Sequence, residues 1–378
     1  MVVMQKGHPL PGKKLPDAIV AHLRERAKEL GFARLGVAPV TPVARGRAAL
    51  ERWLARGEHG ELGYMAREPR DRAAPLQLLP SARAAIVVVA CYARPSAEAP
   101  LAASQGRVAR YARGQDYHRV LREGLAALAD WLNDQLGGHE LEHRACVDTA
   151  PLLERELAMA AGVGFIGKNT MLLTPGVGSY TVLGVLLTSA PLPADSPADA
   201  RCGSCRLCID ACPTAALATD GYRLDARRCV SYLTIERAGP FDDALDPDGS
   251  LRRGSGSWVF GCDDCQQVCP YNRPTRRSDA IPVDPRLDAS AHLATLDLAQ
   301  LLTQRSGDYR RLVRGKALGR TSRPQLARNA AFAAGNRLRE GSRPELVVAL
   351  EEASESPREE VSAAARWALE QAHERDDR

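Results

Sequence analysis

The sequence predicts a fold of mixed α+β and α/β class, with an α/β domain first, a ferredoxin-like insertion and a helical C-terminal region. Three features support this prediction: apolar, β-branched runs in the first half, clustered cysteines in the middle and an alanine-rich helical pattern at the end. With 378 residues, of which 45% are hydrophobic, the chain can form two or three globular units. We expect these units at residues 1–192, 193–280 and 281–378.

The first unit combines helical and strand patterns. Residues 85–92 are an uninterrupted apolar and β-branched run, which predicts a strand whose two faces are both covered, as in an α/β layer. A proline-rich stretch at 191–197 links this unit to the cysteines. Periodicity and composition also predict helices at 17–30, 48–54 and 117–136, strands at 33–38 and 181–188, and a loop at 94–106.

The cysteines form the most specific pattern of the chain. The run from Cys202 to Pro213 has the bacterial C-x2-C-x2-C-x3-C-P spacing, in which three thiolates bind one [4Fe-4S] cube and the fourth binds a neighbouring cube. The run from Cys262 to Pro270 adds three cysteines, and Cys229 completes a group of eight among the chain's 10 cysteines. Because two cubes need eight thiolates, we expect two [4Fe-4S] clusters that carry electrons.

The reciprocal ferredoxin pattern also divides the ligands. Cluster one is assigned Cys202, Cys205, Cys208 and Cys269, and cluster two is assigned Cys212, Cys229, Cys262 and Cys265. Cys229 belongs to cluster two because the second run lacks a fourth cysteine of its own. A pair of four-cysteine zinc sites is the alternative, although the crowded spacing that ends in Cys-Pro suits tetrahedral zinc poorly. Cys91 and Cys146 lie in or beside apolar strands and are interpreted as core residues.

Charge and hydropathy restrict the partners. The net charge of +5 permits a nucleic-acid partner without requiring one. The N-terminus has no apolar run of signal length and no twin arginine, and no stretch of about 20 apolar residues occurs anywhere, so we expect a cytoplasmic protein without a membrane partner. Disulfides are accordingly not expected.

The C-terminal region is basic and then helical. Residues 309–323 form a dense basic run, with Arg328 beyond it, and such clustering favours phosphate binding because each neutralised phosphate releases a counterion. A solvated helix face is the alternative interpretation. Residues 326–371 are alanine-rich and resemble a HEAT-like repeat pair, which should pack on the preceding helices because two helices cannot bury their faces alone.

A conspicuous polar segment lies between the strands. Asp148 precedes Pro151, an arrangement typical of a helix N-cap. A loop with three glycines, Gly162, Gly164 and Gly167, comes directly before Lys168. This loop follows a helix and precedes a strand, whereas a nicotinamide-binding glycine loop follows a strand and precedes a helix. We expect the glycines to let the main chain approach a flat cofactor closely, and a glycine-rich turn with a solvated lysine is the alternative.

Together these motifs resemble the epoxyqueuosine reductase family. The resemblance extends over residues 59–65, 78–83, 110–118, 147–155, 161–173, 231–236 and 261–265. It implies a monomeric, cobalamin-dependent iron–sulfur enzyme that reduces epoxyqueuosine to queuosine at the wobble position of transfer RNA (tRNA). No Asp-x-His-x-x-Gly signature of a cobalt-binding histidine occurs, which agrees with the family, where cobalamin is bound without such a ligand.

The resemblance also implies residue roles. Electrons from an unidentified reductase, flavodoxin or ferredoxin would pass through the two clusters to the cobalamin, starting from cob(II)alamin. Asp148 would be the catalytic proton donor, and because an ordinary aspartate is ionised at neutral pH, we expect burial to raise its pKa. The residues expected to contact cobalamin are Tyr111, Asp148, Lys168, Asn169, Thr170 and Ser231.

Two other functions are compatible with part of this pattern. A corrinoid and iron–sulfur reductive dehalogenase shares the cofactors, but that class is usually exported through a twin-arginine signal, which is not found here. A plain ferredoxin-type electron carrier or RNA-binding module would leave the Asp148 segment and the first unit without a role. His118, taken alone, is more typical of a surface histidine at a helix start than of a ligand.

Overall fold

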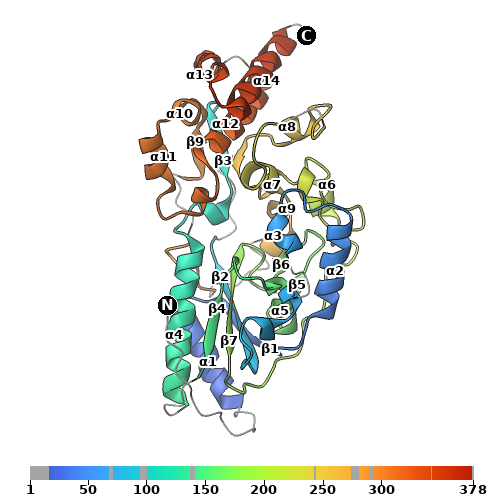
Figure 1. Ribbon diagram of the computed structural model, residues 1–378, viewed down its shortest axis with the longest axis vertical. Coiled ribbons are helices and arrows are strands. Elements are labelled where there is room, and N and C mark those ends of the chain that lie inside the picture. Colours follow the sequence, from blue (N-terminus) through green and yellow to red (C-terminus); the bar gives the residue numbers. More distant parts are fainter. Residues whose placement is uncertain are drawn as a thin grey trace.

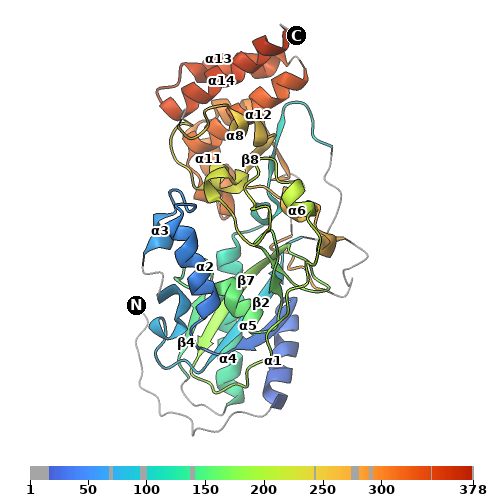
Figure 2. The ribbon, with the colours of Figure 1, turned by 90° about the vertical axis from the view of Figure 1, so that its right-hand side faces the viewer.

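The computed structural model describes residues 17–67, 71–93, 100–136, 141–241, 244–273, 281–288, 293–341 and 343–376. The molecule is elongated, with an N-terminal sheet and its helices at one end and the C-terminal helices at the other (Figure 1). The short helices of the cysteine-rich segment lie between these ends, on one side of the molecule (Figures 1 and 2).

The N-terminal unit is built on a four-stranded sheet with the order β1-β2-β7-β4. Its strands are β1 (Arg34–Ala38), β2 (Ala84–Cys91), β7 (Thr181–Thr188) and β4 (His143–Cys146). All three pairings are antiparallel, so an α+β arrangement describes this sheet better than the expected α/β layer. The strands at 33–38, 85–92 and 181–188 are confirmed.

Strand β2 is buried at every position, which confirms that both its faces are covered. Ile86 and Val88 pack in one apolar cluster with α1 (Asp17–Glu29) and α4 (Tyr117–Gln135). Val87 and Val89 point to the opposite face and pack with α5 (Glu154–Ala160). This division follows from the alternation of side chains along a strand. The predicted helices at 17–30, 48–54 and 117–136 are confirmed by α1, α2 (Ala44–Ala55) and α4.

A second sheet joins segments from all three predicted units. Its order is β8-β3-β9, with β3 (Gln105–Val108) between β8 (Trp258–Phe260) and β9 (Thr295–Asp297). Strand β3 begins inside the predicted loop at 94–106, of which residues 94–99 lie outside the described residues. One apolar cluster continues from Val108 and Phe260 into the C-terminal helices. The division at 192 and 280 therefore remains a prediction, since strand pairing and core packing both cross it.

Short elements place the polar segments. In the N-terminal unit they are α3 (Gly63–Ala66), the 3-10 turns Asp71–Ala73, Pro75–Gln77 and Arg110–Ala112, and the hairpin of β5 (Phe165–Ile166) and β6 (Leu172–Leu173). In the cysteine-rich segment they are α6 (Leu207–Asp210), α7 (Val230–Ile235), α8 (Ser250–Gly254), α9 (Asp264–Gln267) and the 3-10 turns Ala226–Arg228 and Pro270–Asn272.

The C-terminal region is helical and packs on the preceding elements, as expected. It contains α10 (Leu298–Thr303), α11 (Ser306–Val313), the 3-10 turn Ala317–Arg320, α12 (Arg323–Glu340), α13 (Pro344–Ser354) and α14 (Glu359–Asp376). Phe332 of α12 meets Trp367 of α14 edge to face, with ring centroids 5.6 Å apart. Helices α13 and α14 lie at the far end of the molecule and cover α12 (Figures 1 and 2).

Arg328 is part of this core and not of a basic surface. Its side chain is fully buried, and its guanidinium donates to the carbonyl oxygens of Leu233 (2.8 Å), Arg237 (2.9 Å) and Gly239 (2.7 Å). The same group lies 5.1 Å from the ring centroid of Phe241, and burial lowers the pKa of Arg328 to about 10. Arg328 therefore ties α12 to α7 and the loop that follows it.

Replacing Arg328 by methionine should lower the free energy of unfolding by about 3 kcal/mol, because three buried carbonyls lose their donor. Urea unfolding followed by circular dichroism measures the change. Arg366→Met, at an exposed position of α14, is the control and should change stability by less than about 0.5 kcal/mol. Equal unfolding curves for the two variants would contradict this role of Arg328.

Candidate active site and cysteine sets

The cysteines assigned to cluster one lie together. One cavity of about 220 Å³ is lined by all four of them: Cys202, Cys205, Cys208 and Cys269. We call these four residues the first cysteine set. Burial and then the neighbouring thiols, that of Cys269 foremost, raise the pKa of Cys208 to about 11. The fold thus brings the cysteine of the second Cys-Pro pair to three cysteines of the first run, as the ferredoxin spacing predicts.

The cysteines assigned to cluster two also converge. Burial, followed by the nearby Cys229 thiol, raises the pKa of Cys265 well above its ordinary value, and Cys212 contributes to the same effect. Cys265 and Cys229 act in the same way on Cys262, where burial is again the largest cause. Cys212, Cys229, Cys262 and Cys265 are the second cysteine set. Cys265 also lies near Cys208, so the two sets adjoin.

The donor chemistry of both sets fits iron–sulfur cubes. Backbone N–H groups point at cysteine sulfurs, from Lys168 to Cys202 at 3.5 Å and from Ala216 to Cys212 at 3.2 Å, and such hydrogen bonds tune cluster potentials. In the part of the chain that the structure describes, no three His, Cys, Asp or Glu side chains are close enough to share one metal ion.

Asp148 lies in a polar group drawn from separate segments. Its Oδ2 is 3.2 Å from His118 Nε2 and 3.5 Å from Arg320 Nη1. His118 Nδ1 lies 2.7 Å from Asp116, and Arg320 donates to Glu236 at 2.7 Å. We call these five residues the Asp148 cluster. The Asp148 side chain is 45% exposed, so a substrate can reach it.

Three tyrosines border the Asp148 cluster. The Tyr117 hydroxyl hydrogen-bonds to Asp148, and its ring stacks on His118 with centroids 4.1 Å apart. Tyr111 packs edge to face on Tyr117 at 6.2 Å. Tyr64 of α3 is 41% exposed and hydrogen-bonds to Arg320. Aromatic faces beside an exposed carboxylate can hold a planar base next to an acid–base group.

The pKa of Asp148 is lowered, so the expectation of a raised pKa is wrong for this arrangement. The hydrogen bond from His118 is the largest cause and outweighs burial, and the positive charge of Arg320 acts in the same direction. The same hydrogen bond to Asp148 raises the pKa of His118. Both shifts favour a protonated imidazole beside an ionised Asp148.

Asp148 is not a helix N-cap, which excludes the alternative interpretation of its sequence. Helix α5 begins at Glu154 with Leu153 as its cap, and Asp148 has a φ of +55°, in the left-handed region that non-glycine residues rarely adopt. The Asp148 N–H donates to Glu154 Oε1 at 2.7 Å. Burial raises the pKa of Glu154 to about 8. This contact fixes an unfavourable backbone conformation at the residue expected to be catalytic.

Two of the predicted cobalamin contacts, Lys168 and Asn169, lie against the cysteine loops. Lys168 Nζ donates to the carbonyl oxygens of Gly203 at 2.7 Å and Cys205 at 3.0 Å. The Asn169 side chain donates to the Cys265 carbonyl at 3.4 Å. Thr170 has a φ of +64°, and its carbonyl accepts a hydrogen bond from Arg155. Lys168 is thus not a solvated lysine, and it holds the first cysteine set against the β5–β6 hairpin.

The glycines before Lys168 have a structural explanation. A Cβ on Gly162 would come within 2.5 Å of the Ser196 carbonyl oxygen, and one on Gly164 within 2.7 Å of the Leu173 carbonyl oxygen. A Cβ on Gly167 would meet the Leu173 side chain at 2.7 Å. The protein packs on itself where each glycine lacks a Cβ, which explains these glycines without a cofactor, and a close approach of their main chain to a cofactor remains a prediction.

Tyr111 connects the second cysteine set with the Asp148 cluster, and Ser231 contacts the second cysteine set. Tyr111 packs in an apolar group that includes Val230 and borders Cys262, while the charges of Arg320 and Asp148 act on its hydroxyl. The Ser231 N–H hydrogen-bonds to the Cys229 thiol at the start of α7. A cofactor bordered by these two residues would meet both groups.

Two segments of the chain match known family models. Residues 72–149 match the family described as epoxyqueuosine reductase QueG, DUF1730, and residues 201–272 match a 4Fe-4S double cluster binding domain. The chain is 38% identical over 364 residues to the epoxyqueuosine reductase of Xanthomonas campestris pv. campestris, covering 94% of this chain and 97% of that protein. The chain belongs to the epoxyqueuosine reductase family. The Vibrio cholerae enzyme is also 38% identical, over 83% of this chain and 82% of that protein.

Solved epoxyqueuosine reductases share the fold. The Streptococcus thermophilus structure matches with a TM-score of 0.81 and 29% identity, covering 94% of this chain and 90% of that chain. A Bacillus subtilis structure, described with its catalytic aspartate loop swung out of the active site, matches with a TM-score of 0.80 and 28% identity over 94% and 91% of the chains. A complex with an epoxyqueuosine-modified tRNA-Tyr stem loop matches with a TM-score of 0.76 and 28% identity over 94% and 99%.

Some site residues were missed from sequence. Glu236 and Tyr64 lie in family-like segments, but their positions beside Arg320 depend on the fold. Other residues of the 231–236 segment are structural: the buried Tyr232 accepts the Glu61 N–H at 2.7 Å, and the buried Thr234 accepts the Gly261 N–H at 2.9 Å. The resemblance to the family marked residues 231–236 as one segment and did not distinguish Glu236, which lies in the site, from the structural residues Tyr232 and Thr234.

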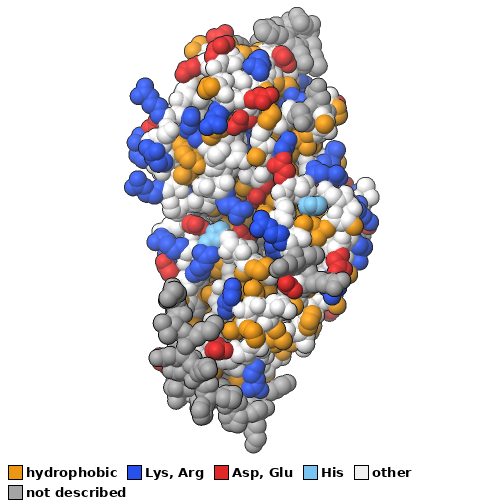
Figure 3. Space-filling view, in the orientation of Figure 1, with side chains coloured by type: hydrophobic (Ala, Val, Ile, Leu, Met, Phe, Trp, Pro, Cys, Tyr) orange, Lys and Arg blue, Asp and Glu red, His pale blue; other side chains and the backbone are white. Residues whose placement is uncertain are grey.

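The basic run reaches the Asp148 cluster through Arg320. Lys and Arg side chains gather over α11 and across the narrow middle of the molecule (Figure 3). The exposed arginines of this surface, the α11 basic face, are Arg305, Arg310, Arg311, Arg314 and Arg320. These five arginines and the Asp148 carboxylate are all exposed, and together they form the expected substrate surface.

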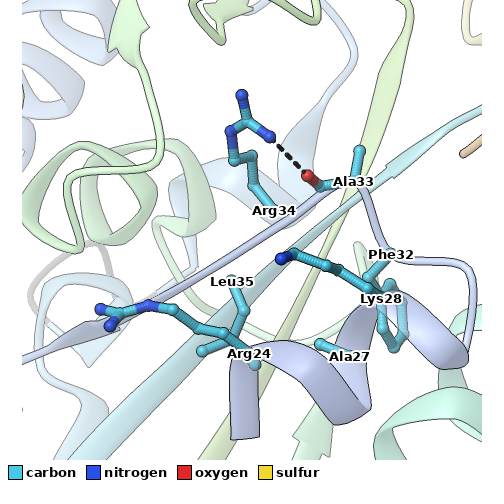
Figure 4. A pocket seen from close by; sticks show the side chains of 7 residues that line it. All are labelled: Arg24, Ala27, Lys28, Phe32, Ala33, Arg34 and Leu35. Atoms are coloured by element: carbon cyan, nitrogen blue, oxygen red, sulfur yellow. Dashed lines mark hydrogen bonds between the residues drawn. The ribbon is translucent and has the colours of Figure 1, made fainter. Parts of the chain in front are cut away.

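A second hollow lies between α1 and β1, away from this site. It has a volume of about 160 Å³, and Figure 4 shows Arg24, Lys28 and Arg34 around it. Arg34 donates to the Ala33 carbonyl, and Arg24 pairs with Asp195, so both arginines already have partners within the protein.

No helix among the described residues has the length and apolar character needed to cross a bilayer.

Proposed function

We propose that this chain reduces epoxyqueuosine to queuosine at the wobble position of tRNA. The observation that carries the proposal is the position of the second cysteine set, which adjoins an exposed acid–base cluster through Tyr111. Family membership supports this function over reductive dehalogenation. The related complex with an epoxyqueuosine-modified tRNA stem loop supports the substrate.

The cofactors would be two [4Fe-4S] clusters and a cobalamin. The first cysteine set would hold cluster one, and the second set would hold cluster two. The residues that would border the cobalamin are Tyr111, Asp148, Lys168, Asn169, Thr170 and Ser231, and Lys168 and Asn169 would also fix the surrounding loops. When bound, these groups supply the two low-potential electrons that loss of the epoxide oxygen consumes.

The protein residues would supply the proton. Loss of the oxygen as water consumes two electrons and two protons, and Asp148 would be the group that faces the substrate oxygen. Because His118 holds the proton behind an ionised Asp148, we propose that the pair acts as one donor, with the imidazolium replenishing the carboxyl. Arg320 and Glu236 would orient the carboxylate, and Glu154 would hold its backbone.

Activity should fall as pH rises through the raised pKa of His118, because the pair then loses its proton. His118→Gln keeps a polar side chain but cannot titrate, so this variant should be about 100-fold slower and lose that alkaline limb. Single-turnover rates between about pH 6 and pH 9 measure both effects. Arg119→Gln, at an exposed neighbouring position, is the control. An unchanged profile in His118→Gln would contradict the shared-proton role.

The helical region would bind the tRNA. We propose that α12, α13 and α14 form a HEAT-like unit and that the α11 basic face holds phosphates of the anticodon stem loop. The modified base would leave its stack and reach Asp148, with the exposed ring of Tyr64 available for stacking. We also propose a cytoplasmic monomer that takes electrons from a separate reductase.

Conversion of tRNA tests this function directly. The chain, reconstituted without oxygen with iron, sulfide and cobalamin, should convert epoxyqueuosine in tRNA to a nucleoside that has lost one oxygen. Failure with loaded cofactors, together with turnover of a halogenated aromatic compound, would favour the dehalogenase alternative.

A further inference from the structure

The two cysteine sets have different surroundings, which gives the electron path a direction. The second set adjoins Tyr111 and, through it, the Asp148 cluster. The first set lines a cavity with Arg201, an exposed residue. Because Cys265 of the second set lies near Cys208 of the first, electrons that reach the active site from solvent would pass the first set before the second. This order rests on the function proposed above.

An apolar surface lies beside the first cysteine set. Leu207, between two of the cysteines in sequence, is 42% exposed, and Tyr222 is 44% exposed. They are two of the five large hydrophobic side chains exposed among the described residues. The Tyr222 hydroxyl hydrogen-bonds to Cys202, and the Tyr222 N–H donates to the Lys168 carbonyl at 2.9 Å. Tyr222 is thus held against the first cysteine set, and Leu207 lies in α6 between Cys205 and Cys208.

Three basic side chains lie near these residues. Arg45 of α2 is exposed and acts electrostatically on the Tyr222 hydroxyl. Arg201 borders the cysteine cavity, and Arg206 is exposed beside Cys205, where it donates to the Thr219 carbonyl at 2.6 Å and pairs with Asp210 at 3.5 Å. A small apolar centre with a charged rim is suited to a transient protein contact, in which charge steers the encounter.

This surface is separate from the substrate surface. Helices α2 and α6 lie on one side of the molecule, while α4 and α11 lie on the opposite side (Figure 1). A carrier bound at the first cysteine set would therefore leave the α11 basic face open. Exposed Leu207 and Tyr222, with Asp210 at the rim, favour a protein partner over a second RNA contact.

We propose that Arg45, Arg201, Arg206, Leu207 and Tyr222 form a docking surface, the carrier patch, for an acidic one-electron carrier protein. In each encounter the reduced carrier loses one electron, and the cluster bound by the first cysteine set gains it. Two encounters supply the two electrons of one turnover, and the two protons come from the active site and solvent. Acidic groups around the carrier's own redox centre would match the basic rim.

The test measures cluster reduction without RNA. The anaerobic holoprotein is mixed in a stopped-flow instrument with reduced flavodoxin, an acidic one-electron donor, and bleaching of the cluster absorbance is followed at low ionic strength. In Arg201→Glu/Arg206→Glu the second-order rate constant should fall about 10- to 100-fold, and added salt should narrow the difference. Reduction by photoreduced deazariboflavin, which is small and uncharged, should be unchanged.

Two further variants keep the test decisive. Arg45 lies outside the cysteine loops, so the clusters should stay intact in Arg45→Glu. This variant should slow cluster reduction by flavodoxin several-fold. Arg358→Glu/Arg366→Glu changes charge equally on exposed residues of the C-terminal region and should have no effect. The proposal is overturned if Arg45→Glu and Arg201→Glu/Arg206→Glu both keep the flavodoxin rate of this control.

The same variants distinguish a carrier from RNA. If they weaken tRNA binding in a gel-shift titration but keep the flavodoxin rate, the patch is an RNA surface and the proposal is wrong. Reduction of the clusters by flavodoxin is measured without tRNA, so failure of epoxyqueuosine conversion would not affect this result. Conversely, conversion driven by deazariboflavin should survive in every patch variant.

Discussion

Cys229→Ala should remove the cluster nearer the active site and reduce epoxyqueuosine conversion by at least about 1,000-fold, since electrons then lose their path to the Asp148 cluster. Cys229 lies apart from both cysteine runs in sequence, yet its thiol lies beside Cys265 and Cys262. With three thiolates left in the second set, iron should fall from about eight to about four atoms per chain. Iron analysis and electron paramagnetic resonance after reduction measure this loss.

Cys91→Ala is the matched control. Cys91 is fully buried in β2, outside both cysteine sets, and its substitution removes one sulfur without removing a predicted ligand. This variant should keep its full iron content and conversion near that of the parent chain. If Cys229→Ala also keeps about eight iron atoms, the ligand assignment for the second set is wrong.

Asp148→Asn should slow conversion by about 100- to 10,000-fold while cluster content and tRNA affinity stay unchanged. Asparagine has nearly the same shape and tolerates the left-handed backbone of this position, so little strain should be added. It cannot accept and pass a proton from His118, and it removes the negative charge between His118 and Arg320. The chemical step should therefore suffer more than substrate binding.

The histidine provides an independent readout of Asp148→Asn. Because the hydrogen bond to Asp148 is the largest cause of the raised His118 pKa, that pKa should move down toward about 6.5 in the variant, as followed by nuclear magnetic resonance. Asp130→Asn, on the exposed side of α4, should change neither the rate nor the His118 pKa. Conversion by Asp148→Asn within about threefold of the parent rate would contradict a catalytic role.

The sequence predicts much of the fold because its signals are local. The apolar run at 85–92 and the helical periodicity at 117–136 each depend on neighbouring residues, and both elements form at the predicted positions. The cysteine spacing also predicts which thiols meet, since a loop with that spacing can wrap only in a limited number of ways. Strand order was not predictable, because β7 pairs with β2 across nearly a hundred residues.

The electrostatics of the site depend on distant residues and were therefore mispredicted. The pKa of Asp148 is set by His118 and by Arg320, and Arg320 comes from the C-terminal region. Likewise, a basic run shows charge but not burial, so Arg328 could not be distinguished from the exposed arginines before it. The contacts of Lys168 with the carbonyls of Gly203 and Cys205 also depend on distant residues, so the sequence did not predict them, while its role as a cofactor contact remains a prediction.

Nucleoside analysis of one anaerobic reaction tests the central claim most directly. The holoprotein, cobalamin, reduced flavodoxin and tRNA carrying epoxyqueuosine are combined, and the RNA is digested for mass spectrometry. The proposed function predicts queuosine, one oxygen lighter than the substrate, formed only with cobalamin and reductant and lost in both Asp148→Asn and Cys229→Ala. Unchanged epoxyqueuosine, despite full clusters and bound cobalamin, would contradict it.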